Sequence, residues 1–104
     1  MATIKEITDK IKQFNDERKW EPYHSPKNLA MSIAIEAAEV MEHFQWLTTE
    51  EARQYGKDHQ KEVGEELADV AVYLFELGRV LEIDLGDAII EKMKKNALKY
   101  PVQK

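Results

Sequence analysis

Residues 58–81 read DHQKEVGEELADVAVYLFELGRVL, and this stretch decides the fold. Its apolar residues recur at alternating intervals of four and three, the heptad-like spacing of helices packed in an antiparallel bundle. They are Val63, Leu67, Val70, Leu74, Leu77 and Leu81. No segment alternates with a period of two, which would predict a half-buried strand. We therefore expect an all-α protein with a long helix here.

Two helices are expected before this one. Apolar residues at helical spacing predict a first helix over residues 3–19. Ser25 followed by Pro26 is a strong helix start, because the serine oxygen can cap the helix and proline is tolerated at its first position. From there we expect a second helix that ends near residue 46 or 47.

The remaining signals concern a short helical segment and a last helix. Residues 48–51 read TTEE, the spacing of a capping box, and Gly56 is expected to interrupt the helical turn that begins there. Asp84 can cap a helix over residues 85–99, which Pro101 ends. The sequence thus predicts four main helices, arranged as a four-helix bundle.

Composition narrows the class of protein. The 104 residues amount to one domain, residues 1–104, and 43% apolar with 34% charged residues is typical of a foldable chain. The formal net charge of −5 argues against binding to nucleic-acid polymers, and the absence of Cys excludes thiolate metal sites and cysteine nucleophiles. No apolar stretch is long enough for a membrane span or a signal peptide, so we expect a cytoplasmic protein without membrane contact.

The second helix carries two charges that a plain bundle would not place there. Residues 29–41 read LAMSIAIEAAEVM, and the only charges are Glu36 and Glu39. On a helical projection Glu36 lies within about 20° of Leu29, a position suited to an apolar residue. An ionised carboxylate in apolar surroundings costs several kcal/mol unless something pairs with it.

The long helix repeats this arrangement. Glu66 and Asp69 have the same spacing of three, and Tyr73 continues their stripe beside the apolar seam. Such pairs are also common on solvated helix faces, but two of them on consecutive helices can share one space. Four carboxylates so close would repel strongly, and a divalent cation would remove the conflict. Carboxylate ligands without His or Cys favour Mg²⁺ first and Mn²⁺ second.

These residues resemble a known family. EAAEV at residues 36–40 and EELADV at residues 65–70 look like the ExxE…ExxD signature of the all-α nucleoside triphosphate pyrophosphohydrolases of the MazG-like group. The resemblance covers nearly the whole chain and is strongest to the dCTP pyrophosphatase branch. It extends to ERKWEPYHSPKNLA (17–30), FQW (44–46) and KMKKNALKYP (92–101).

The resemblance implies an enzyme that hydrolyses a nucleoside triphosphate between its α and β phosphates. Glu36, Glu39, Glu66 and Asp69 would hold Mg²⁺, which neutralises phosphate oxygens and makes a water more acidic. Glu36 and Glu39 would be catalytic, with Glu39 the favoured base for the attacking water. Members of the family pair into homodimers, often into homotetramers, with neighbouring helices completing the pocket.

Aromatic residues suggest where a nucleobase is held. Trp20, Trp46 and Tyr73 offer flat rings on which a base can stack, although a Trp at a helix end is as often a packing residue. The resemblance implies that all three contact the nucleotide. His24 is either a further contact or a turn residue with local hydrogen bonds. Some dCTP pyrophosphatases have a His where this chain has Ile11, which leaves the base preference open.

The last helix presents three polar residues on one face. They are Lys92, Asn96 and Tyr100, spaced four apart. Lys92 can meet phosphate oxygens, Asn96 can donate to and accept from sugar or base, and Tyr100 can stack or hydrogen-bond. We expect this face to bind the nucleotide substrate.

Two other functions compete with this interpretation. A ferritin-like iron bundle needs Glu-x-x-His on two helices, but Glu21 and His24 form the only such pair and Pro22 breaks it. A non-catalytic helical module for oligomerisation is the stronger rival, because apolar seams on short helices can serve self-association alone. Self-association is expected of the enzyme too, so only activity separates these two.

Overall fold

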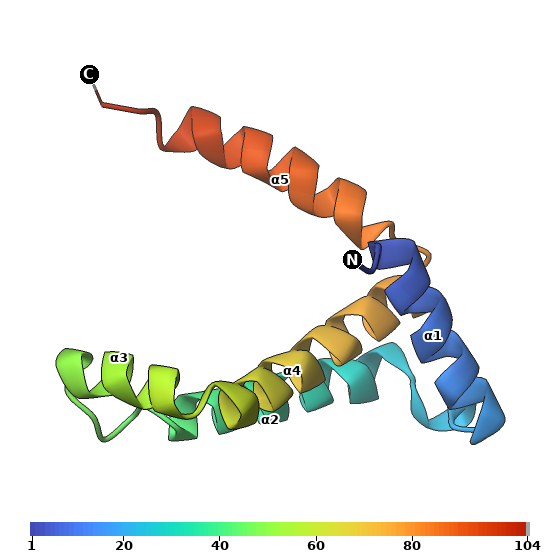
Figure 1. The fold of residues 1–104 in the computed structure, drawn as a ribbon. Coiled ribbons are helices and arrows are strands. Elements are labelled where there is room, and N and C mark those ends of the chain that lie inside the picture. The colour runs from blue at the N-terminus through green and yellow to red at the C-terminus, as the bar shows by residue number, and fades with distance from the viewer. Residues whose placement is uncertain (104) are drawn as a thin grey trace.

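The structure is a computed structural model that describes residues 1–103 and contains helices but no strand in that range. The all-α prediction is therefore confirmed. Helices α2 and α4 run antiparallel side by side, α1 crosses one end of this pair, and α5 projects away as a separate arm (Figure 1). The elements are α1 (Ile4–Glu17), η1 (Glu21–Tyr23), α2 (Pro26–Glu42), α3 (Thr49–Asp58), α4 (Gln60–Val80) and α5 (Leu85–Lys99).

The predicted helix starts are confirmed. Ser25 caps α2 by accepting a hydrogen bond from the Asn28 backbone N–H, and Pro26 takes the first helical position. Thr48 and Glu51 form a reciprocal capping box at the start of α3. Asp84 caps α5 through the backbone N–H of Asp87. These caps satisfy donors that each helix end would otherwise leave free.

Two predicted boundaries were wrong. Helix α2 ends at Glu42, and residues 43–46 form hydrogen-bonded turns instead of continuing the helix. Helix α3 passes through Gly56 without interruption. The cost of about 1 kcal/mol for glycine inside a helix is too small to end one that a full capping box has started. As a result α3 is a fifth helix in its own right.

One copy of the chain is too open to be a finished globule. Its radius of gyration is 16.5 Å, whereas a compact chain of this length has about 13 Å. Ile11 and Leu29 are the only buried apolar residues within residues 1–103. The four-helix bundle, which the family would complete with neighbouring subunits, is not closed by this one copy and stays a prediction.

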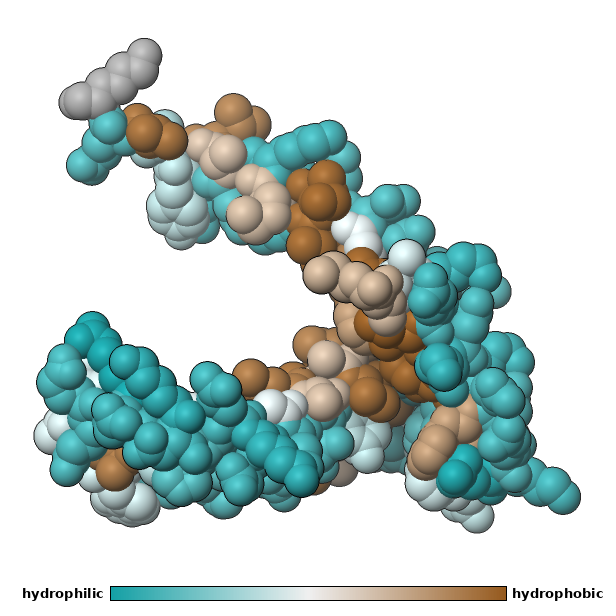
Figure 2. Space-filling view, in the orientation of Figure 1, coloured by the Kyte–Doolittle hydropathy of each residue, from teal (hydrophilic) through white to brown (hydrophobic). Residues whose placement is uncertain are grey.

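The apolar seam of α4 shows where the packing is incomplete. Three of its members, Leu67, Leu74 and Leu81, are 53%, 42% and 47% exposed. Apolar side chains gather on the concave side between α5 and the α2–α4 pair (Figure 2).

Among the described residues, no helix combines the length and apolar character needed to cross a membrane.

Candidate metal centre and adjoining cavity

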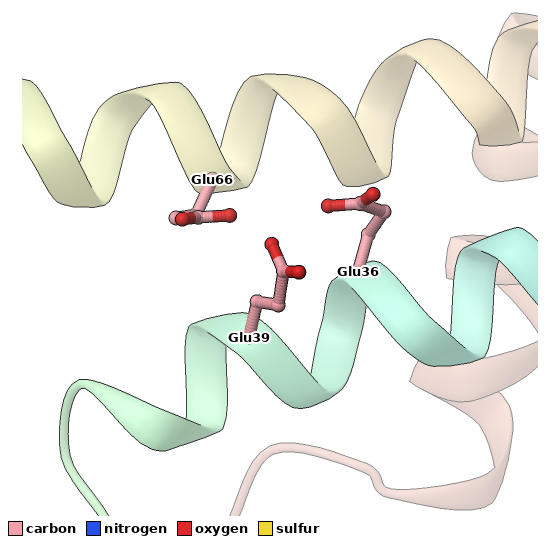
Figure 3. A group of neighbouring side chains, drawn as sticks. All are labelled: Glu36, Glu39 and Glu66. Atoms are coloured by element: carbon pink, nitrogen blue, oxygen red, sulfur yellow. The ribbon is translucent and has the colours of Figure 1, made fainter.

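Three carboxylates converge between the paired helices. Glu36 and Glu39 lie on the side of α2 that faces α4, because residues three apart share one face of a helix. Glu66 extends from α4 toward them (Figure 3). Each residue offers one oxygen, and these oxygens all lie within 4.8 Å of one another. The predicted convergence of acids from two helices is thus present for three of the four residues.

The surroundings of two of these carboxylates, those of Glu36 and Glu66, disfavour their ionised form. The Oε2 atoms of Glu36 and Glu66 are buried and have no hydrogen-bond partner among the described residues. Burial, followed by the charge of Glu39, raises the pKa of Glu36. A hydrogen bond shared with Glu39, followed by burial, raises the pKa of Glu66. The surroundings of the cluster therefore disfavour the charged form of both carboxylates.

This donor set fits a hard divalent cation. Buried polar atoms are normally paired, so two unpaired oxygens facing a shared space need a partner. The cluster offers only carboxylate oxygens, the ligand type that Mg²⁺ and Mn²⁺ prefer. Glu36, Glu39 and Glu66 are the residues that could hold such an ion.

Asp69 lies just beyond this cluster, one helical turn along α4 from Glu66. Its negative charge contributes to the raised pKa of both Glu36 and Glu66. Asp69 also lines a cavity of about 450 Å³. It therefore stands between the carboxylate cluster and the cavity, where a ligand could reach both.

The cavity is an open hollow lined mainly by α1, α4 and the segment between α1 and α2. Its volume lies within the range of small-molecule sites. Trp20 packs edge-to-face on Phe14, with ring centroids 5.5 Å apart. The lining also includes Ile7, Lys10, Ile11, Asn15, His24, Asp69, Val72, Tyr73 and Glu76. Of the predicted nucleotide contacts, the structure thus brings Trp20, His24 and Tyr73 to one cavity with Asp69.

The other predicted contacts lie elsewhere in this copy. Trp46 sits on the turn after α2 and is 86% exposed. Lys92 and Asn96 belong to the α5 arm, and Tyr100 caps the end of that arm with 69% of its surface exposed. Their roles in binding stay predictions, since the described part of one chain does not unite them with the cavity.

A buried polar network that was not predicted from the sequence lines part of the cavity. Glu76, 1% exposed, accepts hydrogen bonds from Asn15, His24 and Arg79. A signal was available, because Glu76 is the only charged residue in VAVYLFELG, residues 70–78. Like Glu36, Glu76 is an isolated acid in an apolar helical stretch.

A second polar group lies beside the carboxylate cluster. His43 follows Glu39 by one helical turn, and its Nδ1 lies 2.8 Å from the hydroxyl of Tyr55 on α3. The charge that His43 can carry acts to lower the pKa of Glu66, against the acids that raise it. Tyr55 of the short helix α3 thus hydrogen-bonds an imidazole whose charge acts on Glu66.

The fold and site together define an all-helical protein with a candidate divalent-metal centre on an antiparallel helix pair, next to a cavity. The model of the MazG-like family matches residues 31–104, which include all four acids. The chain belongs to the MazG-like family, as its sequence motifs predicted.

Named relatives agree with this assignment. The chain is 35% identical over 102 residues to dCTP pyrophosphatase 1 of Mus musculus and 36% identical over 101 residues to that of Homo sapiens. The matches cover 96% and 95% of this chain but 60% and 59% of those proteins, so it spans about three fifths of their length. A crystal structure of a pyrophosphatase from Archaeoglobus fulgidus is 44% identical, with a TM-score of 0.91. That match covers 98% of this chain and 95% of the other.

Proposed function

We propose that the protein hydrolyses a nucleoside or deoxynucleoside triphosphate, with Mg²⁺, to the monophosphate and pyrophosphate. One observation carries the proposal: two helices bring buried, unpartnered carboxylate oxygens together, and Asp69, whose charge acts on them, lines a cavity of about 450 Å³. The names of the relatives support pyrophosphohydrolase chemistry and make dCTP-like substrates the first candidates. Mn²⁺ is the expected alternative ion.

In this proposal the carboxylates have two roles, metal binding and proton transfer. When bound, the cation would neutralise phosphate charge and acidify water. Glu36, Glu39, Glu66 and Asp69 would hold it, and Glu39, as the carboxylate least engaged with the ion, would take a proton from the attacking water. The water oxygen forms a bond to the α-phosphorus as the bond from that phosphorus to the bridging oxygen breaks. Pyrophosphate leaves with that oxygen.

The cavity supplies a place for the nucleobase. Trp20 and Tyr73 would stack on or flank the base, and His24 would contact it from the turn before α2. Asp69 lines the same cavity, so a base held there would place its triphosphate toward the carboxylates. Trp46, Lys92, Asn96 and Tyr100 would join the site from a neighbouring copy of the chain.

Assembly into a homodimer or homotetramer is part of the proposal. The open shape and the exposed members of the α4 seam support it, because large apolar surfaces are rarely left in water. A helical module that only oligomerises would share this feature. The carboxylate cluster favours the enzyme, since a plain interface gains nothing from unpaired buried acids.

Product analysis tests the proposal. The purified protein is given each common dNTP and NTP with Mg²⁺, and ³¹P NMR identifies the products. We expect monophosphate and pyrophosphate in equal amounts from at least one deoxynucleotide. Release of orthophosphate would refute the proposal, because another bond is then hydrolysed. No reaction with any nucleotide by folded protein would refute it and favour the interaction module.

A further inference from the structure

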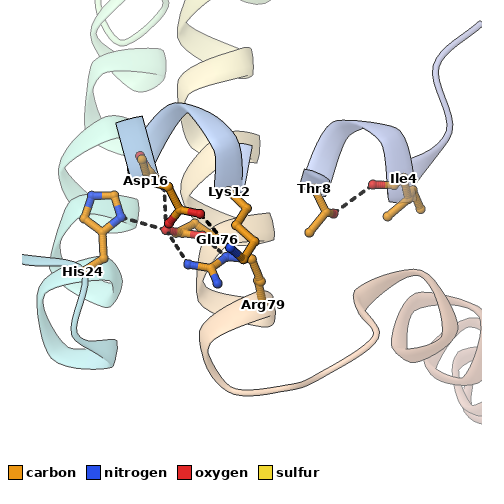
Figure 4. Close-up of polar contacts among 8 residues, drawn as sticks. Ile4, Thr8, Lys12, Asp16, His24, Glu76 and Arg79 are labelled. Carbon is orange, nitrogen blue, oxygen red and sulfur yellow. Dashed lines mark hydrogen bonds and ion pairs between the residues drawn. The ribbon is translucent and has the colours of Figure 1, made fainter. Parts of the chain in front are cut away.

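One carboxylate oxygen, Oε2 of Glu76, joins the two ends of residues 15–24. Asn15 Nδ2 donates to it over 2.6 Å, and His24 Nδ1 lies 2.8 Å from the same atom. Arg79 donates to Oε1 from Nε at 2.7 Å and to Oε2 from a terminal nitrogen at 3.2 Å. Figure 4 shows His24 and Arg79 reaching this carboxylate. A carboxylate accepts about four such bonds, so Glu76 has little capacity left to bind a ligand itself.

Trp20 lies within the segment that this carboxylate closes. Its backbone N–H donates to the Asn15 carbonyl over 3.0 Å, and its own carbonyl accepts the Tyr23 N–H at 2.8 Å. Lys19, directly before it, has a positive φ of 56°, a conformation that favours glycine. Hydrogen bonds at both ends therefore hold a turn that is locally unfavourable, and this turn presents Trp20.

Apolar packing alone does not fix the Trp20 ring. Trp20 is 42% exposed, and Phe14, on which it packs edge-to-face, is 45% exposed. The polar residues that hold the segment are far more buried, since Asn15 is 4% and Glu76 1% exposed. Hydrophobic burial has no preferred direction, whereas hydrogen bonds depend on angle. The buried polar contacts thus supply an orientation that the half-exposed aromatic pair cannot supply itself.

We propose that Glu76 is a positioning residue that holds the Trp20 ring at the cavity, where a nucleobase stacks. It acts through Asn15 and His24, the two ends of the segment that carries the ring. This inference rests on the proposed function, which makes Trp20 a base contact. All four side chains line the same cavity. A ring that is held in place before binding adds affinity, because less freedom is lost when the ligand arrives.

Fluorescence of Trp20 tests the positioning without any nucleotide. The chain has two Trp residues, so every protein compared carries Trp46→Phe and emits only from Trp20. In Glu76→Ala we expect acrylamide to quench Trp20 about 1.5-fold more strongly or more, because the segment opens locally. Leu29→Val is the control for lost stability, since it removes a buried methylene outside the cavity lining. It should lower the Tm and leave Trp20 quenching unchanged.

Binding of dCMP, measured by calorimetry on the same proteins, tests the link to the base. We expect Glu76→Ala to weaken this binding at least about fivefold, the lower end of what one stacked base contributes. Mn²⁺ binding at the carboxylate cluster should stay unchanged, because Glu76 is not part of that cluster. A merely structural role would instead make Glu76→Ala and Leu29→Val alike in Trp20 quenching.

Asn15→Ala is a second variant that removes one tie and keeps the ion pair between Glu76 and Arg79. It decides the matter if Glu76→Ala does not fold. Unchanged Trp20 quenching in the folded variant, an equal change in Leu29→Val, or unchanged dCMP binding would overturn the inference, as would a natural chain that binds no dCMP. A natural chain that binds dCMP but releases no pyrophosphate would refute the proposed function and leave the inference standing.

Discussion

Glu36 on α2 and Glu66 on α4 bring carboxylate oxygens within 4.8 Å of each other, and each keeps a buried Oε2 without a partner in residues 1–103. In a protein without bound cations this relationship opposes folding. The antiparallel pairing of α2 and α4 has to hold two like charges together across the interface. The two carboxylates therefore destabilise the metal-free fold at the place where the proposed function needs a cation.

Replacing Glu36 by Gln should stabilise the metal-free protein and abolish its activity. The pKa of Glu36 is raised by burial and by Glu39, so its ionisation at neutral pH works against the folded state. In EDTA we expect a higher Tm for Glu36→Gln than for the natural chain, with hydrolysis lowered at least about 100-fold. Calorimetry and a pyrophosphate assay measure the two effects. Glu42→Gln, at an exposed position on α2, is the matched control and should change neither.

Asp69→Asn should also remove activity while leaving the fold intact. Asp69 stands between the carboxylate cluster and the cavity, and its charge acts on both Glu36 and Glu66. We expect kcat/KM to drop by at least about 100-fold, with unchanged far-ultraviolet circular dichroism. Full activity in this variant would remove Asp69 from the site.

Acid should weaken the fold through Glu76. Burial alone would raise the pKa of Glu76, but hydrogen bonds from Arg79, His24 and Asn15 outweigh it, and the pKa is lowered from its ordinary value of 4.5. A group with a lowered folded pKa stabilises the fold above its unfolded pKa and loses that contribution as pH falls through the folded pKa.

The test compares urea unfolding at pH 7 and below pH 4.5. The free energy of unfolding of the natural chain should fall on acidification, and the fall should be smaller in Glu76→Gln, which lacks the titrating group. Glu36 and Glu66 act in the opposite direction, but they are common to both proteins. An identical fall in both proteins would show that Glu76 is not ionised in the folded state.

Leu74→Glu should dissociate the assembly. Leu74 belongs to the α4 seam, yet it is 42% exposed in one copy, so a neighbouring copy is expected to cover it. A buried unpaired charge in that interface costs several kcal/mol, enough to turn a dimer or tetramer into monomers at micromolar concentration. Light scattering coupled to gel filtration measures the mass. Lys61→Glu, at an exposed position of the same helix, should leave the mass unchanged, and a natural chain that is monomeric would contradict the proposal.

Local signals predicted most of the fold. Ser25, Thr48 and Asp84 mark helix starts because each cap is made within three residues, so no distant contact is needed to recognise it. Gly56 was misjudged because its effect depends on the balance between one unfavourable residue and the capping box before it. The end of α2 was placed too late because residues 43–46 form turns that helical periodicity does not reveal.

The site was predictable where it depends on helical spacing. Glu36 and Glu39 share a face of α2, and Glu66 lies opposite on α4, so these acids could be paired from the sequence. The role of Glu76 depends on Asn15 and His24, which lie 61 and 52 residues away along the chain and meet it only in the folded structure. The proposed roles of Trp46 and Tyr100 depend on a neighbouring copy of the chain, so the described part of one chain does not test them.

The most direct test of the central claim is Mn²⁺ binding followed by electron paramagnetic resonance, with the natural chain and the double variant Glu36→Gln/Glu66→Gln. The claim is that these carboxylates share a divalent cation. We expect the natural chain to bind at least one Mn²⁺ per subunit, Mg²⁺ to displace it, and the folded double variant to lose this site. Equal binding by both proteins would contradict the claim.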